Sequence, residues 1–159
     1  MKSTSRDLLR HIIATVAYRG GKAIRNAPVN FAEFKIGKTT KTPLQILSHI
    51  GDLYDWALSQ AKGEETWNDS DTLEWKDETE RFFLSIERFD NFLASGSKLD
   101  VEIETLFQGP IADSLTHIGQ IAMLRRLADS PIKGEKYVKA KVTIGRVGND
   151  QEDPLYEFD

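Results

Sequence analysis

Helical periodicity in four segments of the chain constrains its fold more than any other feature of the sequence. Each segment places apolar residues three or four positions apart, so that they line one side of a helix. The expected helices run from residue 4 or 5 into the stretch 20–28, from 42 to 63, from 72 to 94, and from 110 to about 129. This pattern predicts an all-α fold.

The second of these helices has the clearest start. Thr42 is the expected N-cap, Pro43 takes the first helical position, and Gln45 is placed to complete a capping box. Gly63 is the expected end of the helix.

Other boundaries are less defined. The pair Gly20-Gly21 weakens the first helix, but Pro28 is the first residue that forbids its continuation. Residues 101–107 are expected to form a separate helical or extended piece, after which Gly109-Pro110 starts the fourth helix.

The fourth expected helix carries two faces that both call for burial. Ile111, Leu115, Ile118 and Ala122 form one stripe, and Asp113, His117, Gln120 and Leu124 lie on nearly the opposite side. One face must meet the bundle interior, and the other must meet either the C-terminal segment or a second copy of the protein. We therefore expect a homodimer.

Length and composition indicate one domain spanning residues 1–159, with a helical core at about 5–130 and an extension at 131–159. Alternation through residues 137–142 suggests that the extension forms short strands. The net charge of −4 argues against a nucleic-acid partner. No segment approaches the length of a membrane span, and the N-terminal stretch is unlike a signal peptide, so we expect a cytoplasmic protein without a membrane partner.

The residues that carry chemistry are His49 on the second helix and Asp113 and His117 on the fourth. Asp113 and His117 are four residues apart and therefore project from the same helix face. With His49 from a facing helix they would form a three-ligand metal cluster with open positions. The alternative is that the histidines are hydrogen-bonded core residues and that Asp113 accepts one of those bonds or lies near the positive end of its helix.

Several other residues have simpler explanations than a functional one. Asp7 and His11 repeat the four-residue spacing but lie beside the apolar stripe of the first helix, as a solvated pair would. Gln120 is expected to be a surface amide, although it could orient a bound water. The following residues are expected to pack in the core or to favour a helix C-terminus, although they could also line a pocket or meet an anion: Trp56, Trp67, Trp75, Arg125 and Arg126.

The segments TPLQILSHIGDLYDWAL, WKDETERFFLSIERFD and DSLTHIGQIAMLRRL resemble the DinB-like superfamily, which includes YfiT-type metal-binding four-helix bundles and thiol-dependent transferases. The resemblance covers about residues 5–130 and implies a DinB-like four-helix bundle with His49 and His117 as ligands of a divalent metal ion. In that family the last core helix carries an HxxxH pair, and Asp113 stands here in place of its first histidine. A carboxylate can bind the same metals, zinc or nickel being the expected occupants, but it is equally compatible with a site that has lost its metal.

Two functions remain open. The first is a metal-dependent hydrolase or thiol-dependent transferase acting on a small molecule. Because the chain contains no cysteine, a transferase would need a low-molecular-weight thiol from outside. The second is a noncatalytic, stress-associated binding or assembly protein whose polar trio is structural or vestigial.

Overall fold

The computed structural model describes residues 4–158. Four long helices dominate it: α1 (Ser5–Ile24), α2 (Pro43–Ala61), α3 (Trp75–Ala94) and α5 (Ala112–Leu127). The short helix α4 (Ile103–Leu106) and a π-helical turn (Phe107–Ile111) lead directly into α5. The prediction of an all-α four-helix bundle is confirmed.

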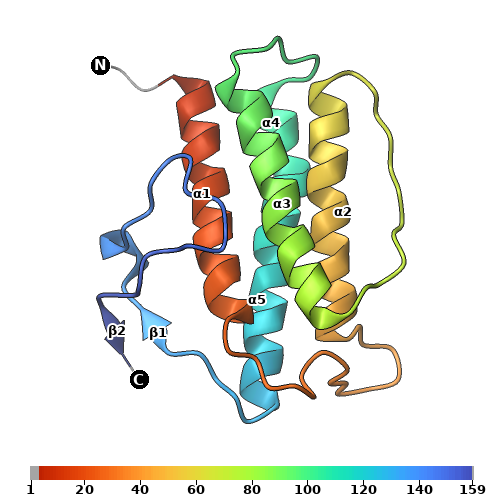
Figure 1. Ribbon diagram of the computed structural model, residues 1–159, viewed down its shortest axis with the longest axis vertical. Helices are drawn as coiled ribbons and strands as arrows, with labels where there is room; N and C mark the ends of the chain where they lie inside the picture. The colour runs from red at the N-terminus through yellow and green to blue at the C-terminus, as the bar shows by residue number, and fades with distance from the viewer. Residues whose placement is uncertain (1–3, 159) are drawn as a thin grey trace.

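The direction of the helices determines which loop reaches the functional site. In Figure 1, α1 and α5 run one way and α2 and α3 run the other, so that the neighbours α2 and α3 are parallel. The connection between them, residues 62–74, therefore has to travel back along the outside of α2 (Figure 1). The middle of this connection passes beside α2 rather than beyond its end.

Helix α1 passes through Gly20-Gly21 without a break and ends at Ile24. A capping box between Thr4 and Asp7 starts it. A Cβ atom on Gly20 would lie 2.3 Å from the ring of Phe82 on α3, so the glycine permits close packing of the two helices.

Helix α2 begins as predicted, with a complete capping box between Thr42 and Gln45 and with Pro43 in the first turn. It ends at Ala61, two residues before Gly63, which has a φ of +77°. The left-handed backbone at Gly63 explains why a glycine follows this helix.

Helix α3 starts at Trp75, three residues later than predicted. Just before the helix, the backbone N–H of Leu73 donates to the buried carboxylate of Glu78, in the first turn of α3, at 2.9 Å. Earlier residues of the connection are anchored on α2, at Ser59 and Asp52, which local periodicity could not reveal.

The predicted break before the fourth long helix is present. Ile103–Leu106 form a separate short helix, and Gly109, with a ψ of −106°, lies outside helical geometry, so that two helices meet at a kink there. Pro110 follows the kink directly, where its missing N–H costs no hydrogen bond to the preceding helix. The Ser114 hydroxyl donates to the carbonyl of Pro110 at 2.6 Å and closes the junction.

The C-terminal extension packs on α1 (Figure 1) and contains a short antiparallel pair, β1 (Gly134–Glu135) with β2 (Glu157–Phe158). The predicted strand pair is confirmed, but its strands lie outside residues 137–142, where Tyr137–Lys139 form a 3₁₀ turn. Ile132 and Tyr137 of the extension lie beside Leu115 and Ala122 of α5, where the four line one small cavity. The extension thus contributes to covering the stripe of α5 that contains Leu115 and Ala122.

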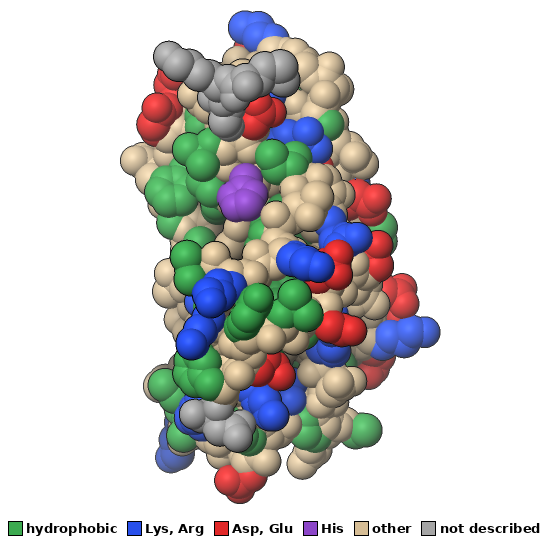
Figure 2. Space-filling view, turned by 90° about the vertical axis from the view of Figure 1, so that its left-hand side faces the viewer, with side chains coloured by type: hydrophobic (Ala, Val, Ile, Leu, Met, Phe, Trp, Pro, Cys, Tyr) green, Lys and Arg blue, Asp and Glu red, His purple; other side chains and the backbone are tan. Residues whose placement is uncertain are grey.

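The surface over α1 and the extension mixes charged and hydrophobic side chains. Figure 2 shows lysine, arginine and acidic groups interspersed with separate hydrophobic areas on this face. Within residues 4–158, no helix combines the length and the hydrophobicity that a membrane crossing requires.

Candidate metal centre

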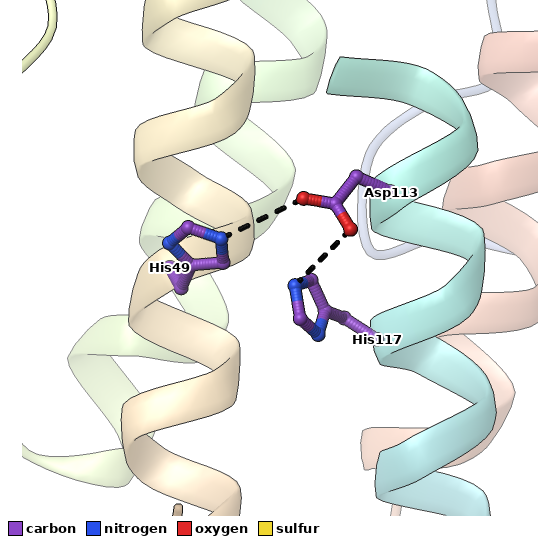
Figure 3. A group of neighbouring side chains, drawn as sticks. All are labelled: His49, Asp113 and His117. Carbon is purple, nitrogen blue, oxygen red and sulfur yellow. Dashed lines mark ion pairs between the residues drawn. The ribbon is translucent and has the colours of Figure 1, made fainter. Parts of the chain in front are cut away.

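The three predicted ligands meet where α2 faces α5. Figure 3 shows the His49 ring projecting from α2 toward the side chains of Asp113 and His117 on α5. Each residue offers a ligand atom, and these atoms all lie within 4.8 Å of one another. The two imidazole rings stand nearly perpendicular, at 85°, with their centres 4.9 Å apart. The predicted juxtaposition of the three residues is therefore present.

The carboxylate lies between the two rings without a hydrogen bond to either. Asp113 Oδ1 is 3.5 Å from His117 Nε2, and Asp113 Oδ2 is 3.8 Å from His49 Nε2. Both separations exceed the usual hydrogen-bond length. Donor atoms of a tetrahedral ion with bonds of about 2.1 Å lie about 3.4 Å apart, so the spacing suits a shared ion better than direct contacts.

The donor set also suits a divalent metal ion. Two imidazoles and one carboxylate leave one or more coordination positions open for water or a substrate. The side chains are 24%, 47% and 16% exposed for His49, Asp113 and His117, so solvent reaches the centre from the carboxylate side.

Gln120 holds the His117 ring. His117 Nδ1 lies 2.9 Å from Gln120 Oε1, one turn further along α5. With the amide oxygen as acceptor, Nδ1 carries the proton and Nε2 keeps its lone pair, directed at Asp113. Such a partner behind a ligand histidine is typical of metal sites. Gln120 is exposed, as expected of a surface amide, and it also holds the His117 ring.

His49 is surrounded by groups that favour its neutral form. Burial lowers the pKa of His49, and the neighbouring side chains of His117 and Lys41 lower it further, while Asp113 and Asp52 act in the opposite direction. A neutral imidazole has a free lone pair at neutral pH, which is the form that binds metals.

Trp67 forms one wall of the centre. Its ring meets His49 edge to face at 5.7 Å and Trp56 at 5.6 Å. Both tryptophans therefore lie near the site, whereas Trp75 packs against Phe31, as expected of a core residue.

Two anchors fix the segment that carries Trp67 against α2. On one side, the backbone N–H of Thr66 donates to Ser59 Oγ at 2.9 Å. On the other, the backbone N–H of Ser70 donates to Asp52 at 3.2 Å, and Arg81 from α3 pairs with the same carboxylate. The sequence gives little sign of these contacts, because they join residues of different elements.

The remaining candidates have structural roles. Asp7 caps α1, and His11 is exposed. Arg125 is 4% exposed and donates to the carbonyls of Ala23 and Arg25, at the end of α1. Arg125 was expected to interact with a helix C-terminus. It does so, at the C-terminus of α1.

Comparison of the chain with known protein families, with curated proteins and with solved structures found no match. The resemblance to the DinB-like superfamily therefore remains an interpretation of the sequence, and the function has to be argued from the site itself.

Proposed function

We propose that the protein is a DinB-like bundle that binds one divalent metal ion, zinc or nickel, through His49, Asp113 and His117. The observation that carries this proposal is the carboxylate placed between two imidazoles at 3.5 and 3.8 Å, too far for hydrogen bonds and close to the spacing of ligands on one ion. The hydrogen bond from His117 to Gln120 supports it, because it leaves Nε2 free to act as a ligand.

The reaction proposed for this centre is hydrolysis of a small electrophile or transfer of an external thiol to it. A divalent ion held here would supply a nucleophile near neutral pH by lowering the pKa of a bound water or thiol. The thiol has to be a separate small molecule, since the chain has no cysteine. Trp56 and Trp67 limit access from one side, and Asp113 borders an open hollow between α2 and the π-helical turn through which a substrate can enter.

Thiol-transfer and hydrolytic substrates assayed with zinc- and nickel-loaded protein test this proposal. His49→Ala and His117→Ala should abolish turnover while leaving the helical content unchanged. His11→Ala is the matched control, because His11 is exposed and outside the centre. Activity that survives the loss of both site histidines would exclude the mechanism.

A noncatalytic binding or assembly role is the second candidate. The observation that favours it is the state of Asp52, one turn from His49, which is committed to Arg81 and to the backbone of Ser70 and so does not offer a free general base. Inactivity across the substrate panel, with metal bound at one ion per chain, would favour this role.

We further propose a cytoplasmic homodimer. Exposed apolar side chains remain on the surface, among them Leu8 on α1 and Phe107 in the π-helical turn. Light scattering coupled to size exclusion measures the mass, and a strict monomer at micromolar concentration would contradict the dimer.

A further inference from the structure

A groove with a volume of about 410 Å³ lies beside the metal centre, toward the C-terminal end of α5. Its walls come from α5, from the first turn of α2 and from the connection between α1 and α2. The apolar residues that line it are Ile36, Ile46, Met123, Leu124 and Leu127. The volume falls in the range of small-molecule sites.

The floor of the groove is buried and its rim is open. Ile46 and Leu124 are 4% and 6% exposed, whereas Ile36, Met123 and Leu127 are 54%, 56% and 50% exposed. The lining side chains are aliphatic or thioether groups without a ring, and they suit a flexible hydrocarbon chain. From Gln120 to Leu127 the helix rises by about 10 Å, which is the reach of a medium-length chain.

Two polar residues join this groove to the metal centre. Gln120 lines the groove and is the hydrogen-bond partner of His117. Lys41 lines the groove and also borders the polar hollow that contains His49. One end of the groove thus carries the Lys41 ammonium, beside a polar hollow that Asp52, Asp69 and Asp71 also line, and the rest of the groove is hydrophobic.

Lys41 forms no ion pair within residues 4–158, although aspartates line the neighbouring hollow. It differs in this from Lys22, whose ammonium group lies 2.9 Å from the Glu135 carboxylate. An unpaired ammonium at the end of an apolar groove favours a ligand that brings a negative charge and a hydrophobic body.

We propose that the groove binds a medium-chain aliphatic carboxylate, with the chain between Ile46 and Leu127 and the carboxylate at Lys41. The approach of the carboxylate to the metal centre rests on the proposed function, whereas the groove and Lys41 do not depend on it. The ligand class for the proposed centre is then an amphipathic anion rather than a neutral polar molecule.

Calorimetric titration of the metal-free, full-length protein with decanoate and with the neutral decanol tests the groove. Leu127→Glu should weaken the binding of decanoate by about tenfold or more, since it places a carboxylate against the chain. Leu84→Glu is the matched control, because Leu84 is 53% exposed on α3 and lies outside the groove. It should leave binding unchanged.

Lys41→Ala should weaken decanoate binding by about tenfold and leave decanol binding unchanged, because only the anion loses a charged partner. Lys38→Ala, an exposed lysine outside the groove, should change neither. Three results would overturn the proposal. The first is no binding of decanoate, and the second is an equal loss of decanoate affinity in Leu127→Glu and Leu84→Glu. The third is an equal loss of affinity for decanoate and for decanol in Lys41→Ala. A groove that instead holds a second copy would show a dimer that Leu127→Glu dissociates, without decanoate binding.

Repeating the titrations with zinc separates this inference from the proposed function. If the centre binds zinc, the ion should strengthen the binding of decanoate and not that of decanol. If zinc does not bind but the affinity for decanoate still depends on Lys41 and Leu127, the proposed ligand site in the groove is supported and the proposed metal function is excluded.

Discussion

The imidazole of His117 is held by the side chain of Gln120 through a hydrogen bond of 2.9 Å between Nδ1 and Oε1. This contact directs Nε2 of the same ring toward Asp113, 3.5 Å away. Gln120, a residue outside the predicted ligand set, thus orients the imidazole ring of one of the three predicted ligands.

Removing this hydrogen bond should weaken metal binding without abolishing it. In Gln120→Ala the His117 ring gains freedom and loses the acceptor for Nδ1–H, so zinc affinity should fall by about 10- to 100-fold. Competition with a chromophoric chelator measures the affinity. Gln108→Ala, an exposed glutamine near the start of α5, is the control, and an equal loss in both variants would show that Gln120 has no special role.

The buried guanidinium of Arg125 should be a major source of stability. It joins the end of α1 to the end of α5 through carbonyls of Ala23, Arg25 and Ser130. In Arg125→Ala these acceptors lose their partner, and the free energy of unfolding should fall by about 2 to 4 kcal/mol. Urea denaturation measures it.

Arg126 is the matched control for that measurement. It is the next residue along α5 but exposed, and Arg126→Ala should change the free energy of unfolding by less than about 0.5 kcal/mol. Similar effects of the two substitutions would mean that the contacts of Arg125 with α1 contribute little.

The contact of the extension with α1 should weaken at high pH. Tyr18 donates to Glu135 at 2.6 Å, and burial, together with this bond, raises the pKa of Tyr18. Burial alone would lower the pKa of Lys22, but its bonds to Glu157 and Glu135 raise that pKa overall. Both groups therefore hold their protons more tightly in the folded state than in the unfolded chain.

The sign of the effect follows from linkage. A raised folded pKa stabilises the fold fully below the unfolded value, about 10 for both groups, and this contribution is lost as the pH rises above it. Between pH 9 and 11 the free energy of unfolding should fall more steeply in the wild type than in Tyr18→Phe. Tyr156→Phe, which removes an exposed phenol, should keep the wild-type slope. Parallel curves for Tyr18→Phe and the wild type would contradict the assignment.

Local signals predicted the parts of the fold that are determined locally. The capping box of Thr42 and Gln45 lies within one turn and depends on nothing outside α2, so its position could be predicted to the residue. The reason for a glycine at position 20 of α1 could not be predicted, because a Cβ atom there would meet the Phe82 ring of a distant helix. The same holds for the connection before α3, where the backbone of Ser70 is anchored on Asp52 of α2.

The candidate site divides in the same way. The spacing of Asp113 and His117 predicts that they share a helix face, and the helical pattern of the second helix already pointed to His49 as the third member of the cluster, with the resemblance to a known family in support. The sequence left open whether Trp67 packs in the core or lines a pocket, because its position depends on the parallel arrangement of α2 and α3 and on two anchors of the loop between them. Lys41 was missed, since nothing in its local sequence relates it to His49.

The metal content of the purified protein tests the central claim most directly. After loading with zinc and removal of the free ion, elemental analysis should find one zinc per chain in the wild type and in His11→Ala, and none in His49→Ala or His117→Ala. Asp113→Asn should retain less zinc than the wild type, because it removes the charged ligand. Equal zinc content in the wild type, His49→Ala and His117→Ala would contradict the assignment of this centre.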